Sequence, residues 1–164
     1  EIARREGISE GTLFRHYKNK NEIIIGALDH YSQYDSDIIE SAKLMNLKTK
    51  DAVMYLIKAY SEYYANYPPI TAIAHIYEVL IQDDELSAKV TGIFNNRSSY
   101  ITQSIRKGQM NGEISTNIDA QGLSDIILGF LRETVLRWRI NGYNFSLKDT
   151  VLTTLETILN AFSL

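Results

Sequence analysis

The chain contains no cysteine. This absence excludes disulfide bonds, thiolate metal sites and cysteine nucleophiles, and it permits a reducing compartment. Proline is almost as rare, because only Pro68 and Pro69 occur, and strand-like alternation of apolar and polar residues is scarce. A chain of 164 residues with 45% hydrophobic content and so few helix breakers is predicted to be helical with a real core.

Long hydrophobic runs are also missing. The longest aliphatic runs, such as residues 23–25 and 126–128, fall far short of the roughly 20 residues needed to cross a bilayer. No signal peptide pattern opens the chain, so a soluble cytoplasmic protein without membrane contact is predicted. Residue 1 is not methionine and the chain opens as though inside a helix, so we expect its natural start to lie upstream.

Charge is modest in total but uneven along the chain. The formal net charge is -3, which argues against a general polyanion binder. Residues 1–20 nevertheless carry a net charge of +2, so the remaining residues carry -5. A basic end on an acidic body is consistent with local phosphate contact at the amino-terminal end.

Capping residues and apolar periodicity divide the chain into helices. Asn19, with Glu22 three residues later, is expected to cap a long helix that joins the head to the body. One helix is expected after Pro68-Pro69, with Ile76 and Tyr77 within it. The expected starts of the other helices are Ser9, Thr49, Asn117 or Asp119, and Ser146 with Asp149.

The first 28 residues hold a motif with specific spacing. An apolar pair, a glycine, a helix-starting serine and an aromatic–basic run follow in close order: Ile2-Ala3, Gly7-Ile8-Ser9, Gly11-Thr12-Leu13-Phe14, Tyr17 and Lys20. That order suits a helix-turn-helix, whose second helix lies in the DNA major groove. These residues resemble the helix-turn-helix signature of the TetR family of bacterial transcriptional regulators.

The resemblance implies an all-α protein in two parts. Residues 1–28 would form a partial helix-turn-helix domain whose first helix is missing, and residues 29–164 a helical ligand-binding and dimerisation domain. The implied function is a ligand-responsive DNA-binding transcriptional regulator, a repressor released by a small molecule. Its partners would be a double-stranded DNA operator, a small apolar or aromatic ligand and a second copy of the chain.

Five residues of the head are candidates for DNA contact. By resemblance, Thr12, Phe14, His16 and Lys20 match positions that touch phosphates, and Arg15 lies among those that read base edges. The paired donors of arginine suit the O6 and N7 acceptors of guanine. Lys20, near a helix N-terminus, would reach a phosphate as a point charge.

Two departures from the family pattern keep an alternative open. Phe14 lacks the hydroxyl of the tyrosine often found at its position, and Glu10 would repel nearby phosphates. The alternative is an all-helical small-molecule-binding or adaptor protein whose head no longer binds DNA.

Aromatic residues crowd the middle of the chain and suggest a ligand pocket. An apolar cavity with a few polar tips is the usual form of a small-molecule site, and tyrosine hydroxyls can hold the polar end of a ligand. The simpler interpretation is that these are core tyrosines at helical spacing. The candidate pocket residues are Tyr60, Tyr64, His75, Tyr77, Phe94 and Trp138.

The last two expected helices are the most continuously apolar. Two copies of the chain could bury them as a four-helix interface, as the resemblance implies, although an intramolecular core explains them almost as well. The candidate interface residues are Ile127, Phe130, Leu131, Leu152, Leu155 and Leu159.

Residue patterns for catalysis or metal binding are weak. No Ser-His-acid spacing, phosphate loop or nucleotide motif occurs, and His30 and His75 lack partners at metal-ligand spacing. We therefore predict no enzyme, no cofactor and no metal site. A helical enzyme using His75 and nearby tyrosines is the remaining alternative.

Overall fold

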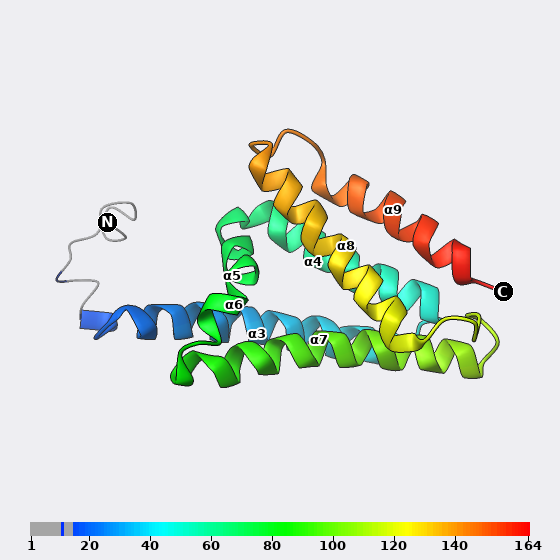
Figure 1. Cartoon of the computed structure of the whole chain (residues 1–164), viewed down its shortest axis with the longest axis horizontal. Coiled ribbons are helices and arrows are strands. Elements are labelled where there is room, and N and C mark those ends of the chain that lie inside the picture. The colour runs from blue at the N-terminus through cyan, green and yellow to red at the C-terminus, as the bar shows by residue number, and fades with distance from the viewer. Residues whose placement is uncertain (1–10, 12–14) are drawn as a thin grey trace.

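The computed structural model describes residue 11 and residues 15–164 and consists of helices (Figure 1). The described part of the chain contains no strand, only a single antiparallel bridge between Ile114 and Ser163. The all-α architecture expected from the sequence is therefore confirmed. The helices are α3 (Lys20–Leu44), α4 (Thr49–Asn66), the 3-10 turn η1 (Pro68–Ile70), α5 (Thr71–His75), α6 (Tyr77–Leu80), α7 (Asp84–Met110), α8 (Ala120–Ile140) and α9 (Leu147–Phe162).

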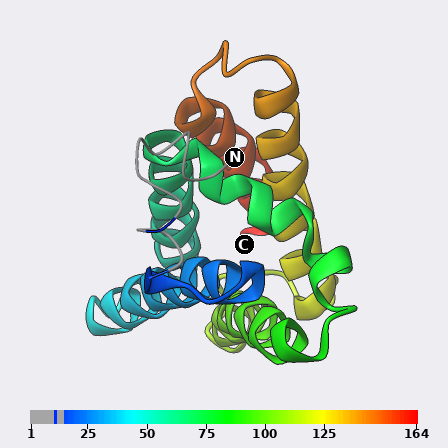
Figure 2. The same ribbon diagram turned by 90° about the vertical axis from the view of Figure 1, so that its left-hand side faces the viewer.

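The long helices surround one hydrophobic core. Helices α3 and α7 run side by side, α4 packs on α9, and α8 contacts both α7 and α9. Viewed from the left-hand side of Figure 1, the short α5–α6 segment crosses the near end of the bundle between α4 and α8 (Figure 2). All five long helices contribute to the largest fully buried side chains, among them Tyr31 of α3, Tyr60 of α4, Ile101 of α7, Ile127 of α8 and Leu155 of α9. The core thus lies between these five helices.

Local side-chain caps explain where most helices begin. Asn19 accepts a hydrogen bond from the Glu22 backbone N–H at 2.9 Å, and Ser146 accepts one from the Asp149 N–H at 3.2 Å, as expected. Of the two candidates before α8, Asp119 is the cap and accepts from the Gly122 N–H at 2.9 Å. These contacts satisfy backbone donors that the first helical turn leaves free.

The expected cap of α4 is wrong by one residue. Lys48 occupies the cap position without a side-chain hydrogen bond, and Thr49 is the first helical residue. The Thr49 hydroxyl instead donates to the Ser104 carbonyl of α7 at 3.2 Å, while its N–H donates to the Glu113 carboxylate at 2.9 Å. A distant carboxylate therefore replaces the local cap.

The single helix expected after Pro68-Pro69 is also wrong. The prolines open the 3-10 turn η1, and the chain then forms two short helices separated at Ile76, where φ is -111° and ψ is 13°. The Thr71 hydroxyl donates to the Pro68 carbonyl at 2.6 Å and stabilises the turn. Packing of this broken segment against α8 and α7 outweighs the helical pattern of its sequence.

The expected boundary between residues 28 and 29 falls within α3. This helix runs without interruption from Lys20 to Leu44, and its Leu28 is fully buried in the core. Near its start, Gly26 leaves room for the half-buried ring of Tyr17, which lies 3.4 Å from where a Cβ would be. Helix α3 therefore continues from the amino-terminal residues into the body.

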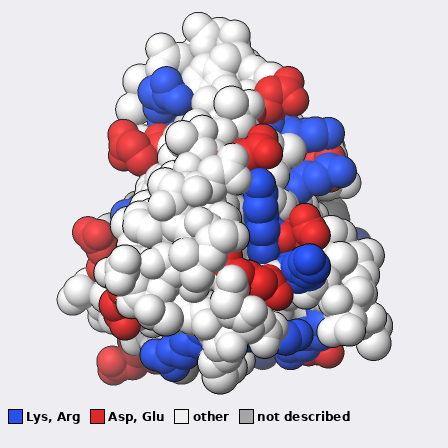
Figure 3. Space-filling model, turned by 90° about the vertical axis from the view of Figure 1, so that its right-hand side faces the viewer, with Lys and Arg blue, Asp and Glu red and all other residues white. Residues whose placement is uncertain are grey.

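The described surface shows no large area of one charge where Figure 3 views it. Acidic and basic side chains lie next to one another there, beside a broad uncharged area. None of the described helices is long and apolar enough to span a membrane.

Candidate functional site

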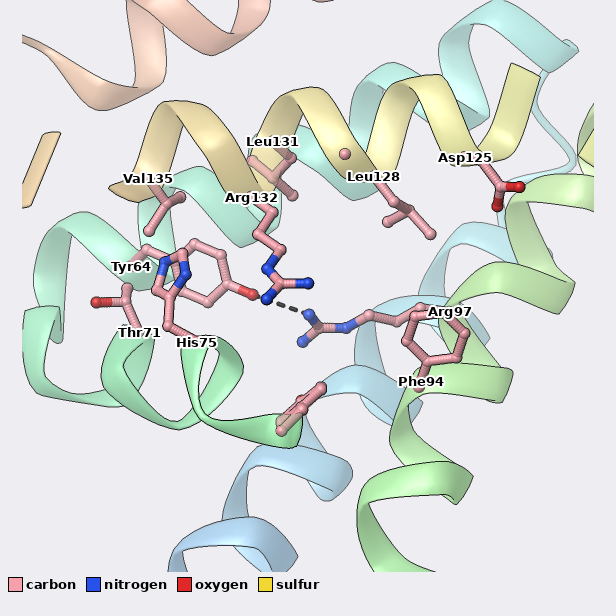
Figure 4. A pocket seen from close by; sticks show the side chains of 12 residues that line it. Tyr64, Thr71, His75, Phe94, Arg97, Asp125, Leu128, Leu131, Arg132 and Val135 are labelled. Carbon is pink, nitrogen blue, oxygen red and sulfur yellow. Dashed lines mark hydrogen bonds between the residues drawn. The ribbon is translucent and has the colours of Figure 1, made fainter. Parts of the chain in front are cut away.

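A cavity of about 250 Å³ opens between α5, α6, α7 and α8 (Figure 4). This is somewhat below the roughly 300–1,000 Å³ typical of ligand pockets. Its walls are largely apolar and aromatic. The lining residues are Tyr64, Thr71, His75, Tyr77, Phe94, Arg97, Asp125, Leu128, Gly129, Leu131, Arg132 and Val135.

Four of the six candidate pocket residues line this cavity. Tyr64, His75, Tyr77 and Phe94 come from α4, α5, α6 and α7, so the fold brings together residues from four separate helices. Phe94 is 54% exposed, whereas Tyr64 is buried. The aromatic crowding in the sequence thus reflects a real cavity as well as a core.

The other two candidates lie elsewhere. Tyr60 is fully buried one helical turn before Tyr64, with its ring 4.1 Å from the Arg97 guanidinium carbon, and it does not line the cavity. Trp138 packs at the α8–α9 turn, because its indole N–H donates to the Phe145 carbonyl at 3.0 Å and its ring meets Tyr143 edge-on. Trp138 therefore does not line this cavity.

A buried ion pair forms one side of the cavity. Arg97 of α7 donates through Nε and Nη2 to the two carboxylate oxygens of Asp35 on α3, at 2.6 Å and 2.5 Å. The Asp35 side chain is 1% exposed and that of Arg97 is 10% exposed. Such a fork-to-carboxylate pair fixes both position and orientation, so it ties α7 to α3 at the base of the cavity.

Tyrosines surround the guanidinium of this pair. Arg97 lies over the rings of Tyr31 and Tyr60, 4.4 Å and 4.1 Å from their centroids. Its Nη1 donates to the Tyr64 hydroxyl at 2.9 Å, and that hydroxyl is also hydrogen-bonded to the hydroxyl of Tyr31. Ring faces and hydroxyls compensate part of the cost of burying this cation.

Burial and neighbouring charges shift the pKa values of two groups at the site. Burial raises the pKa of the Asp35 carboxyl above its ordinary value, and the adjacent Arg97 opposes that rise. Burial lowers the pKa of His75, and the positive charges of Arg139 and Arg132 lower it further. The Glu133 carboxylate opposes this shift in part, and His75 is neutral near pH 7.

Two polar atoms of the lining have no hydrogen-bond partner among the described residues. They are Nε2 of His75 and the hydroxyl of Tyr77, and both are buried from solvent. Buried polar atoms are normally paired, so these two are available to hydrogen-bond a ligand in the cavity.

A second arginine lies at the cavity. Arg132 of α8 has a 53% exposed side chain and is 3.7 Å from the Glu78 carboxylate of α6. Figure 4 shows its side chain directed from α8 toward the space that Arg97 enters from α7. An exposed ion pair at this distance contributes roughly 0–1 kcal/mol, so Arg132 can exchange Glu78 for another anion at little cost.

Sequence reasoning missed Arg97, Asp35 and Arg132. A signal for the first two was present. Asp35 lies on the apolar stripe of α3 between Tyr31 and Ile38, and Arg97 lies on that of α7 between Ile93 and Ile101. A charged residue in a row of core positions indicates a buried pair or a site.

The candidate DNA-contact residues are only partly within the described residues. Thr12 and Phe14 lie outside them. Arg15, His16 and Lys20 are exposed, and Lys20 is the first residue of α3. Exposure leaves these three side chains available for contact with DNA.

Four of the six candidate dimer residues are core residues of the single chain. Ile127 of α8 and Leu155 and Leu159 of α9 are fully buried, and Leu131 is 4% exposed. Their assignment to an interface is corrected, because the inner faces of α8 and α9 pack on α7, on α4 and on each other. Phe130 and Leu152 remain partly exposed.

A comparison with known protein families shows which family the chain belongs to. Residues 36–161 match the TetR C-terminal family described as "YsiA-like protein, C-terminal region". The chain belongs to the TetR family of transcriptional regulators. The sequence-based identification is confirmed, and this TetR-family protein is a ligand-responsive transcriptional regulator, as predicted.

Individual relatives agree with this family. The "Fatty acid metabolism regulator protein" of Bacillus subtilis is 23% identical over 161 residues, which cover 98% of this chain and 82% of that protein. The crystal structure of FadR from Bacillus subtilis in complex with stearoyl-CoA matches with a TM-score of 0.74 and 21% identity, over 96% of this chain and 84% of that one.

The fold also matches that of PfmR, a TetR-family transcriptional regulator from Thermus thermophilus. The TM-score is 0.81 at 18% identity, over 97% of this chain and 85% of the PfmR chain. The members of this family and the named relatives are regulators rather than enzymes.

Proposed function

We propose that this TetR-family protein is a cytoplasmic repressor that leaves its DNA operator when a small apolar molecule enters the cavity between α5, α6, α7 and α8. The observation that carries this proposal is the Arg97–Asp35 pair, which joins the cavity wall to α3. Helix α3 begins at Lys20, next to the candidate DNA-contact residues. A shift of Arg97 in the cavity wall would therefore be passed through Asp35 to α3, the helix that leads to the candidate DNA-contact residues.

The cavity chemistry supports an apolar ligand. Leu128, Leu131 and Val135 of α8 form one wall, and Phe94 and Tyr77 add aromatic surface from α7 and α6. Burying an apolar body contributes about 25 cal/mol per Å², while the few polar groups orient the ligand. The similar FadR of Bacillus subtilis forms a complex with stearoyl-CoA, a molecule with a long apolar chain, which is consistent with a ligand of this character.

We infer that the protein acts as a homodimer through the outer faces of α8 and α9. Ile126 and Ile140 of α8 are 46% and 75% exposed, and Phe130 and Leu152 are partly exposed. Two heads related by a two-fold axis would read half-sites about 34 Å apart in successive major grooves.

Binding of the full-length protein to DNA from upstream of its own gene tests the proposal. We expect Lys20→Ala to weaken binding to all sequences alike and to reduce the salt slope by about 1, because it removes a phosphate contact. We expect Arg15→Ala to relax base preference by about 1–3 kcal/mol, because it removes a base-edge contact.

Lys58→Ala is the matched control, because Lys58 is an exposed lysine on α4, outside the motif of residues 1–28. It should leave both affinity and base preference unchanged. Unchanged binding in the Arg15 and Lys20 variants would remove these residue assignments. Absence of any DNA binding by the full-length protein at low salt would overturn the proposed function.

A further inference from the structure

Two groups at the cavity can only donate hydrogen bonds, the guanidiniums of Arg97 and Arg132. The Tyr77 hydroxyl and Nε2 of the neutral His75, both unpaired among the described residues, can each donate or accept. The Thr71 hydroxyl is already committed to the Pro68 carbonyl, and Asp125 is exposed and accepts from Gln121. A ligand that complements this set presents acceptor atoms.

Arg97 has capacity for a second anion. Its Nε–H and one Nη2–H go to Asp35, and Nη1 has only the neutral Tyr64 hydroxyl as partner among the described residues. The remaining N–H groups of Nη1 and Nη2 have no acceptor there. Guanidinium groups form their strongest hydrogen bonds with carboxylates, so the side that Tyr64 occupies is a place for an anionic group.

We propose that the ligand is an apolar acid whose anionic group binds Arg97, with Arg132 as a second contact, and that this contact weakens the Arg97–Asp35 bond to α3. The inference rests on the proposed function, because it assigns the ligand class and the coupling residue of the same cavity. Asp35 then shares Arg97, its one charged partner among the described residues, with a second buried anion. Two carboxylates repel each other strongly at such a site, and the bond between α7 and α3 loosens.

Two buried contacts join residues of the cavity lining to α3, the Arg97–Asp35 pair and the hydrogen bond between the hydroxyls of Tyr64 and Tyr31, and the first of these carries charge. A second ion pair, Lys89–Asp29, also joins α7 to α3, but its side chains are 38% and 57% exposed and its residues do not line the cavity. The two pairs therefore differ in burial and in access to the ligand while linking the same helices. This makes Lys89→Met a matched control for Arg97→Met.

Titration calorimetry of the full-length protein with three probes tests the ligand class. Decanoate, decanamide and decylamine share an apolar chain and differ in charge. We expect decanoate to bind about 10-fold to 100-fold more tightly than decanamide, the factor that a hydrogen bond to a charged group supplies, and decylamine to bind most weakly.

Single substitutions show which side chains cause the preference for decanoate over decanamide. Arg97→Met should bring decanoate and decanamide to similar affinity, Arg132→Gln should reduce the preference in part, and Lys89→Met should leave it unchanged. Asp35→Asn should have the opposite effect and increase the preference, because it removes the competing carboxylate and keeps the Arg97 charge. Because Arg132 is exposed, its variant tests the site even if the buried variants fail to fold.

Amide hydrogen exchange tests the coupling to α3. Saturating decanoate should reduce protection of residues 28–38 in the wild-type protein and in Lys89→Met, with α9 as an internal reference. Unchanged protection of α3 would overturn the coupling. Equal affinity for decanoate and decanamide would overturn the acid preference while leaving an apolar ligand cavity intact, whereas failure of all three probes to bind would count against the cavity itself and this inference with it.

Discussion

The buried Arg97–Asp35 pair is the residue-scale feature on which the account depends most. Arg97→Met leaves the Asp35 carboxylate buried without its cation, and breaking a buried pair in this way costs about 3–5 kcal/mol. We expect that loss in the free energy of unfolding, measured by urea titration. Lys89→Met, which removes an exposed pair between the same helices, should cost less than about 1 kcal/mol. Similar losses in the two variants would show that the buried pair does not hold α3 to α7.

The aromatic candidates show how much of the site was predictable at this scale. A third of the residues that line the cavity were predicted from the aromatic composition of the sequence: Tyr64, His75, Tyr77 and Phe94. Tyr60 and Trp138 share that composition but point into the core and the α8–α9 turn. Helical spacing identifies a buried face, and only the packing of neighbouring helices determines which buried residues border a cavity.

At the scale of the element, close packing of α7 on the start of α4 yields a sharp prediction. A Cβ on Gly108 would lie 2.5 Å from the Thr49 hydroxyl oxygen and 2.9 Å from its Cβ. Gly108→Ala should therefore lower the free energy of unfolding by about 1–3 kcal/mol through overpacking.

Gly92→Ala is the control on the same helix. Nothing lies within 4 Å of its Cβ position, so higher helix propensity should stabilise the protein by about 0.5–1 kcal/mol. Thermal unfolding of both variants checks that Gly108→Ala destabilises the protein and that Gly92→Ala stabilises it. Stabilisation by Gly108→Ala would contradict the close contact between α7 and α4.

The helices themselves were predictable where their signals are local. Asn19, Asp119 and Ser146 cap through their own side chains, and the sequence identifies each of them as a candidate start. The start of α4 at Thr49 was not predictable, because the Glu113 carboxylate takes the place of a local cap there. The helix break at Ile76 was not predictable either, because packing against α7 and α8 causes it. Contacts distant in sequence leave no mark on a local pattern.

At the scale of the whole molecule, apolar periodicity could not separate core from interface. It correctly identified α8 and α9 as the most apolar helices, yet Ile127, Leu131, Leu155 and Leu159 are buried within one chain. The buried face of a helix looks the same in sequence whether its partner is the same chain or a second copy. The family, by contrast, was predictable because many residues of the amino-terminal motif agree at fixed offsets.

Release of DNA by a ligand in the cavity is the central claim, and one titration tests it most directly. Fluorescence anisotropy would follow the full-length protein on labelled DNA from upstream of its own gene, with and without decanoate at a concentration that saturates the cavity by calorimetry. The account predicts that decanoate lowers the DNA affinity by about 5-fold to 150-fold, the usual range of coupling between two sites. An unchanged DNA affinity with the cavity fully occupied would contradict it.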